Sequence, residues 1–341
     1  MSVTHLLESR LPVLAAPMAG GPSSVALGAA VSSAGGFAFL AGGYKRPDAL
    51  AAEIAAARQW DAPFGVNLFA PGSFEPDLQA FAAYAQRLTP EAEVYQLELD
   101  PTPHTDDDHW HDKLALLLDN PVPVVSFTFA LPPAGDSARL RKVGSIVLAS
   151  VTTVDEALAA EAAGVDGLVV QGSSAGGHSA TWDPQRSIVN RPTEQLVTDV
   201  HTATRLPLIA AGGIDGPHSA AALIAAGAEA VAVGTLLLRA EEAGTVQTHR
   251  DALAARGGAG TVMTCAFTGR PARALRNGFV ERHASAAIIG YPAVHHLTGE
   301  LRRRAAAAGD ADRLHLWAGT GYRQAEARPA SMIIQALSQQ L

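Results

Sequence analysis

The chain has 341 residues, of which 48% are hydrophobic and 6% aromatic, and 25 basic and 33 acidic side chains give a net charge of −8. This acidic balance, without a long basic run, argues against nucleic acid or an anionic membrane as a partner. The single cysteine, Cys265, excludes an intramolecular disulfide framework and a cysteine-rich metal site. No signal peptide and no apolar run of about 18 residues is present, so we expect a cytoplasmic protein.

Eight short apolar runs, each with the length of a buried strand, follow one another along the chain. They lie at 12–16, 36–40, 64–69, 122–127, 145–151, 167–171, 207–211 and 230–234. Most are separated by Ala- and Leu-rich segments of helical period, most clearly 25–34, 47–59, 76–88, 155–163, 193–204 and 218–226. Eightfold alternation of strand and helix predicts an α/β fold of the (β/α)₈ TIM-barrel type, with a doubly wound open sheet as the alternative.

The pattern changes after residue 235. An Arg- and Ala-rich region of helical character continues to about residue 309. We interpret 241–305 as a smaller helical substrate or lid domain inserted after strand eight. Residues 1–240 and 306–341 would then form the barrel, with a final helix at 327–341 covering it.

An acidic, histidine-containing segment lies at 105–112. It could hold a metal ion, because His and Asp are metal ligands. A capped and solvated helix start explains the same residues more simply, and we predict no metal.

The residues that follow the first and third predicted strands are candidate ligand contacts, because barrel enzymes place their chemistry at the carboxyl ends of the strands. After the first strand, Pro17 fixes a turn, and Met18 can lie flat on a planar ring or simply fill the core. Asn67 is an amide in an otherwise apolar strand. A buried amide needs partners, so Asn67 either caps a loop or bonds the polar edge of a ring.

The loop after the sixth strand contains Gln171, Gly176, Gly177 and then His178. Glycines allow the backbone to approach a ligand closely. His178 is the only titratable side chain in this loop, and imidazole exchanges a proton near neutral pH. It is the candidate catalytic residue, and a loop histidine bonded to a carbonyl is the structural alternative.

Glycine turns also follow the seventh and eighth strands, at Gly212-Gly213 and Gly234-Thr235, and each leads into a helix start. These two loops are the usual phosphate cradle of a barrel, in which backbone N–H groups bind the anion. The glycines therefore predict a phosphate-bearing ligand. No GxGxxG follows the first strand, which disfavours a Rossmann domain, and no serine nucleophile elbow or HExxH motif is present.

Several segments together resemble the FMN-dependent nitronate monooxygenases, formerly called 2-nitropropane dioxygenases. They are APMAGG at 16–21, GVNLF at 65–69, VTTVDEALAAEAAGVDGLVVQGSSAGGH at 151–178, PLIAAGGI at 207–214 and AVAVGT at 230–235. The similarity spans nearly the whole chain. Four further segments resemble the class I branch: VVSFTFALP at 124–132, FTGRPARALRN at 267–277, YPAVHHLT at 291–298 and LWAGTG at 316–321.

The resemblance implies a barrel that holds FMN at its C-terminal face, beneath a helical substrate domain. His178 matches the catalytic histidine of the family, and Tyr291 matches a tyrosine that lines the substrate pocket. The predicted cofactor-binding residues are Pro17, Met18, Asn67, Gln171, Gly176, Gly177, Gly212, Gly213, Ala232, Val233, Gly234 and Thr235.

The implied reaction is the oxidation by O₂ of an alkyl nitronate, such as propionate 3-nitronate, or of a nitroalkane. It passes through a flavin semiquinone and gives a carbonyl compound and nitrite. Neither a metal nor a nicotinamide is required. The expected partners are small molecules, and the expected state is a monomer or a homodimer.

The chain departs from the family at two places. Ser179-Ala180 stands where relatives more often carry Arg-Gly, and Thr320-Gly321 stands where Gln-Gly is usual. Either change would reshape the edge of the substrate pocket.

Two other functions stay open. An FMN-dependent, NAD(P)H-consuming enoyl-acyl carrier protein reductase or quinone reductase shares the AGGH and AAGGI loops, although FTGRPARALRN and LWAGTG favour the nitronate enzymes. A flavin- or phosphate-binding barrel acting as a carrier or regulator is the non-enzymatic alternative, and it would not need His178.

Overall fold

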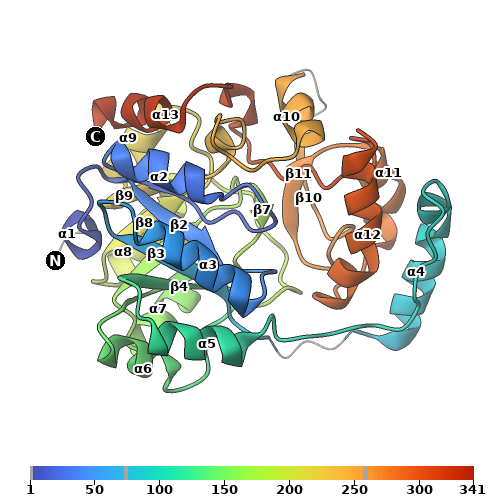
Figure 1. The fold of residues 1–341 in the computed structure, drawn as a ribbon, viewed down its shortest axis with the longest axis horizontal. Coiled ribbons are helices and arrows are strands. Elements are labelled where there is room, and N and C mark those ends of the chain that lie inside the picture. Colours follow the sequence, from blue (N-terminus) through green and yellow to red (C-terminus); the bar gives the residue numbers. More distant parts are fainter. Residues whose placement is uncertain (1–2, 73–75, 256–259) are drawn as a thin grey trace.

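A closed barrel of eight parallel strands forms the larger part of the computed structural model (Figure 1), which describes residues 3–72, 76–255 and 260–341. The strands are β1 (Val13–Ala15), β2 (Phe37–Ala41), β3 (Phe64–Phe69), β4 (Val124–Thr128), β5 (Ile146–Val151), β6 (Gly167–Gln171), β8 (Leu208–Ala211) and β9 (Ala230–Val233). Every predicted run contains or overlaps one of them. Because β1 pairs with both β2 and β9, the sheet closes, and the open-sheet alternative is wrong.

Helices cover the outside of the barrel and connect its strands (Figure 1). They are α2 (Val25–Ser33), α3 (Pro47–Ala57), α5 (Trp110–Asp119), α6 (Asp136–Lys142), α7 (Val154–Ala162), α8 (Thr193–Ala203), α9 (Pro217–Ala225) and α13 (Ala330–Leu337). The short α1 (Val3–Leu7) precedes β1. Val3 and Leu7 pack in one cluster with Leu14, a residue of β1. The predicted final helix is present as α13, whose Ile333 and Ile334 pack in the barrel core.

Local signals in the sequence explain where helices begin and end. Thr153 caps α7, because its hydroxyl accepts a hydrogen bond from the backbone N–H of Glu156. Gly164 and Gly227 follow helices α7 and α9 with φ of +77° and +114°, a conformation that glycine adopts without a steric cost. Short 3₁₀ turns are η1 (Thr235–Leu237), η2 (Ala284–Ala286), η3 (Tyr322–Gln324) and η4 (Ser338–Gln340).

A second unit packs beside the carboxyl ends of the strands. Between 241 and 305 lie helices α10 (Gln247–Ala254), α11 (Gly278–His283) and α12 (Ala293–Ala307), and also strands β10 (Thr261–Thr264) and β11 (Ala272–Leu275). The two strands form an antiparallel sheet with β7 (Gly177–His178), which comes from the glycine loop after β6. The segment predicted as helical is therefore mixed, and its sheet reaches into the barrel loops.

Helix α4 (Leu78–Glu93) also belongs to this unit by its packing, although it lies between β3 and β4 in the sequence. Figure 1 shows it beside α11 and α12, away from the barrel. Its Phe81 and Tyr84 lie in one apolar cluster with Phe267 and Phe279. The position on the barrel is taken by α5 instead, because Trp110 of α5 packs against Phe127 of β4, with ring centroids 5.6 Å apart.

Candidate active site

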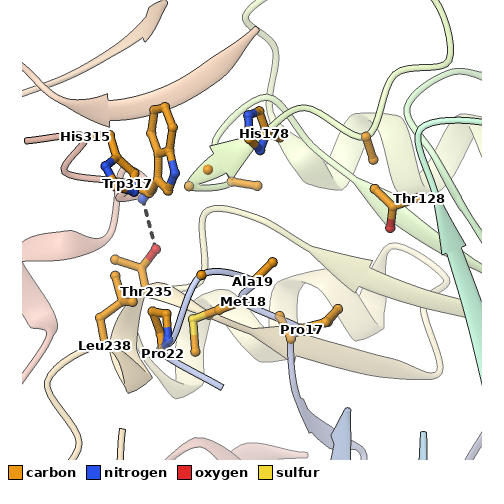
Figure 2. A pocket seen from close by; sticks show the side chains of 18 of the residues that line it. Pro17, Met18, Ala19, Pro22, Thr128, His178, Thr235, Leu238, His315 and Trp317 are labelled. Atoms are coloured by element: carbon orange, nitrogen blue, oxygen red, sulfur yellow. Dashed lines mark hydrogen bonds between the residues drawn. The ribbon is translucent and has the colours of Figure 1, made fainter. Parts of the chain in front are cut away.

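A cavity of about 520 Å³ lies at the carboxyl ends of the barrel strands, and the second unit forms its other wall. Figure 2 shows Pro17, Met18 and Thr235 on one side of it, facing His178 and Trp317 on the other. All the predicted cofactor-binding residues and His178 line this cavity. Its volume falls within the range typical of small-molecule sites.

The loops after β8 and β9 have the backbone geometry that an anion cradle requires. Gly212 and Gly213 adopt φ of +103° and +83°. A Cβ atom on Gly212 would lie 2.8 Å from the backbone nitrogen of Ala175. Within the described residues, the N–H groups of Gly213, Gly234 and Thr235 donate no hydrogen bond to the protein. Unused donors at the start of helical turns fit a phosphate group.

The segment that follows α12 closes over this cradle. The Thr235 hydroxyl accepts a hydrogen bond of 2.9 Å from the Gly319 N–H, drawn as the dashed line in Figure 2. A Cβ atom on Gly176 would lie only 2.4 Å from the same Gly319 nitrogen. Gly176 is therefore required for the approach of two backbone segments, in addition to any approach to a ligand.

Asn67 presents a buried, unused acceptor to the cavity. Its Nδ2 donates to the Ser126 hydroxyl at 2.9 Å and to the Thr128 hydroxyl at 3.0 Å, both on β4. The side chain is only 3% exposed, and within the described residues its Oδ1 has no hydrogen-bond partner. Because buried polar atoms are normally paired, Oδ1 is suited to accept from an N–H on a ligand ring.

Gln171 holds the histidine loop in place. Its Nε2 donates to the His178 carbonyl at 3.2 Å, and its Oε1 accepts from the Ala180 N–H at 2.7 Å. The sequence alone did not indicate this role. Within the described residues, the second amide hydrogen of Gln171 has no partner and could donate to a cofactor. The predicted contact between Gln171 and the cofactor stays a prediction.

His178 is fixed from both its backbone and its ring. As part of β7, it pairs with Ala272 of β11. Its Nε2 lies 2.8 Å from the Thr268 hydroxyl, which itself donates to the Arg270 carbonyl at 3.5 Å. The direction of the bond between His178 and Thr268 depends on the tautomer of the ring: where Nε2 carries the hydrogen, the hydroxyl accepts and Nδ1 is the basic nitrogen. Within the described residues, Nδ1 has no hydrogen-bond partner.

Two arginines and burial hold His178 in its neutral form. The ring lies against Trp317 and Tyr291, with centroids 5.4 and 5.7 Å away. Burial, and then the charges of Arg270 and Arg302, lower the pKa of His178 to about 3. Its imidazole is therefore uncharged at neutral pH.

The second unit contributes residues that reasoning from the sequence missed. His249, Thr268, His295 and Arg302 line the cavity, and so does Trp317, which follows the second unit in the sequence. Burial lowers the pKa of His249 to about 4. The spacing of His295, Thr298 and Arg302 along one helix face was the available signal, because residues three, four and seven apart share a face.

Three residues that the sequence patterns single out do not line the cavity. Tyr291 lies behind His178 and Phe129, with its ring 5.5 Å from that of Phe129. Ser179 is buried beneath Arg270, and Thr320 is exposed, whereas their neighbours Ala180 and Gly321 do line the cavity. The predicted contact of Tyr291 with substrate stays a prediction.

The segment at 105–112 lies outside the cavity. His104, Asp106 and His296 have ligand atoms within 4.8 Å of one another and could hold a metal ion, but His104 and Asp106 are exposed. α5 begins at Trp110, as the helix-start interpretation expects, but the N-cap residue His109 makes no side-chain capping hydrogen bond, so the predicted cap is wrong. The prediction of no metal stays a prediction.

The fold is a closed (β/α)₈ barrel with a cavity at the carboxyl ends of its strands, and comparison with known proteins identifies its family. The family model described as nitronate monooxygenase matches residues 3–340. A probable nitronate monooxygenase of Staphylococcus aureus (strain MSSA476) is 32% identical over 343 aligned positions, which cover 99% of this chain and 96% of that protein. The chain therefore belongs to the nitronate monooxygenase family, and it is an oxidoreductase that acts on nitronates or nitroalkanes.

Solved structures support the same assignment. The nitroalkane oxidase from Streptomyces ansochromogenes superposes with a TM-score of 0.93 and 44% identity, covering 99% of this chain and 97% of that one. FabK from Thermotoga maritima superposes less closely, with a TM-score of 0.77 and 28% identity over 99% of this chain and 94% of its own. Among the described helices, none is both long and apolar enough to cross a membrane.

Proposed function

We propose that the protein binds FMN in this cavity and oxidises alkyl nitronates and nitroalkanes with O₂, giving a carbonyl compound and nitrite. The observation that carries the proposal is the neutral His178, whose Nδ1 has no partner within the described residues and which shares one cavity with the glycine cradle. A phosphate-bearing planar cofactor and a small substrate can lie side by side there.

The cavity residues fit FMN group by group. The N–H groups of Gly213, Gly234 and Thr235 would hold its phosphate, and Oδ1 of Asn67 would accept from a ring N–H. Met18 lines the same cavity and would lie against the ring. When bound, FMN would supply the redox chemistry, in which electrons from the nitronate pass to O₂.

His178 would act on the proton of the substrate. Its Nδ1 would accept the α-proton of a neutral nitroalkane, and a nitronate, which lacks that proton, would not need this step. Thr268 would accept from Nε2–H in this step and so hold the ring in the tautomer that has a basic Nδ1. The aromatic rings around His178 would exclude water from this step.

The turnover of a preformed nitronate should not depend on the ionisation of His178. Because its pKa lies near 3 instead of 6.5, the side chain stays neutral as the pH falls from 8.5 to 6. We expect log kcat/KM for a small nitronate, added freshly from alkaline stock, to be flat between about pH 6 and 8.5. A break near pH 6.5 that disappears in His178→Asn would contradict the assigned neutral state.

An NAD(P)H-consuming reductase is the second candidate, because FabK shares the fold at 28% identity. Anaerobic mixing of the yellow protein with NADH or NADPH separates the two functions. We expect the flavin absorbance to persist with either nicotinamide and to bleach with a nitronate. Rapid bleaching by NADH alone would favour the reductase.

The cytoplasmic location and the monomeric or homodimeric state stay predictions.

A further inference from the structure

The most unusual charge in the cavity is the guanidinium of Arg302 on α12. The residue is only 7% exposed, and it lines the cavity together with His178 and His295. Within the described residues, no carboxylate lies within 4.0 Å of it. A buried cation without a counter-charge is costly unless a ligand supplies one.

The guanidinium is held in one orientation by neighbours on its own helix. Its Nε donates to the Thr298 hydroxyl at 3.0 Å, and its Nη2 donates to the carbonyl and to Nδ1 of His295 at 2.9 and 3.1 Å. The His295 ring stacks on Tyr44, with centroids 4.1 Å apart and planes inclined by 4°. Within the described residues, Nη1 has no protein partner and is therefore free to bind a ligand.

The other nearby arginine is already engaged. Arg270 donates to the carbonyls of Ser179 and Thr181, and its guanidinium lies 3.9 Å from the centre of the Phe129 ring. Unlike Arg302, it does not line the cavity. Arg303 also lines the cavity, but it is exposed and pairs with Glu300, so within the described residues Arg302 is the buried lining arginine without a carboxylate partner.

We propose that Arg302 binds the negatively charged oxygens of the substrate, so that Arg302, and not His178, sets the preference for the nitronate anion over the neutral nitroalkane. This inference rests on the proposed function and names the residue that recognises the anion. The neutral His178 cannot supply that charge, whereas burial lowers the pKa of Arg302 only to about 10, so it remains a cation at neutral pH. The same site should accept planar oxyanions of similar shape, including nitrate and the product nitrite.

Nitrate binding to the flavin-loaded protein tests the proposal without turnover. In calorimetric titrations at constant ionic strength, we expect Arg302→Met to weaken nitrate binding by about tenfold or more and Arg302→Lys to weaken it less, because a charged hydrogen bond is lost or partly kept. Arg304→Met is the matched control: Arg304 is exposed on the same helix, pairs with Glu300 and does not line the cavity. Its affinity for nitrate should match that of the unmodified protein.

Kinetics then connect the site to the substrate. Arg302→Met should raise KM for a nitronate by about tenfold or more, with a smaller change for the corresponding neutral nitroalkane. Nitrate should compete with nitronate in the unmodified enzyme. Equal nitrate affinity in Arg302→Met and the unmodified protein would overturn the proposal, and so would loss of FMN from both Arg302 variants, which would assign the residue to the cofactor. If nitrate binding depends on Arg302 but no nitronate is oxidised, the anion site stands and the proposed function fails.

Discussion

Replacing His178 with asparagine is expected to leave FMN bound and to slow the turnover of neutral nitroalkanes by about 100- to 10,000-fold, the usual contribution of a general base. The asparagine amide cannot accept the α-proton, but it can still hydrogen-bond to Thr268. In the unmodified protein the Thr268 hydroxyl lies 2.8 Å from His178 Nε2. Steady-state kinetics with a nitroalkane and with its preformed nitronate measure the effect. The nitronate should lose much less activity, because its proton has already left.

The diagnostic quantity is the ratio between the loss of nitroalkane turnover and the loss of nitronate turnover in His178→Asn. Thr268→Val provides a graded comparison, since it removes only the partner of Nε2 and should slow nitroalkane turnover less than loss of the imidazole does. Equal losses with nitroalkane and nitronate in His178→Asn would assign His178 to binding and not to proton transfer. Unchanged nitroalkane turnover would remove it from the mechanism.

Replacing Gly212 with alanine should have the second large effect, on cofactor affinity. The residue has φ of +103°, and a Cβ atom would lie 2.8 Å from the Ala175 nitrogen and 3.0 Å from the Gly172 carbonyl oxygen. An L-residue in such a conformation costs roughly 1–3 kcal/mol, before the contact with Ala175 is counted. Since the loop would have to move, we expect FMN affinity to fall by about tenfold or more, measured by the quenching of flavin fluorescence on binding.

Gly216→Ala is the matched control, four residues further along the same loop. No atom lies within 4 Å of the position that a Cβ would take on Gly216, and the residue has an extended φ of 172°. Its substitution should leave FMN affinity within about twofold. If Gly212→Ala binds FMN as tightly as Gly216→Ala does, the loop after β8 is not the phosphate cradle.

The barrel could be predicted because each strand is a short apolar run that begins and ends at a local signal. Thr153 as an N-cap and Gly164 as a C-terminal glycine mark α7 in the sequence and in the structure. The position of α4 could not be predicted. Its apolar face fits a barrel helix equally well, and only the aromatic cluster with Phe267 and Phe279, which lie far along the chain, decides where it packs.

The barrel side of the site could also be predicted, because its residues follow strands whose ends must converge. The side of the site that the second unit forms could not be predicted, because it depends on contacts between segments that are distant in the sequence. Thr268 meets His178 only because β11 pairs with β7, and a two-residue strand leaves no periodic signal. Arg302 lies in an Arg-rich helical stretch, in which nothing local distinguishes the buried arginine from exposed Arg303 and Arg304.

An oxygen-electrode assay of the yellow, FMN-containing protein with a panel of small nitronates tests the central claim most directly. We expect nitronate-dependent oxygen consumption accompanied by nitrite and a carbonyl product, without any need for NADH. No oxygen consumption with any nitronate, combined with rapid oxidation of NADH, would contradict the account.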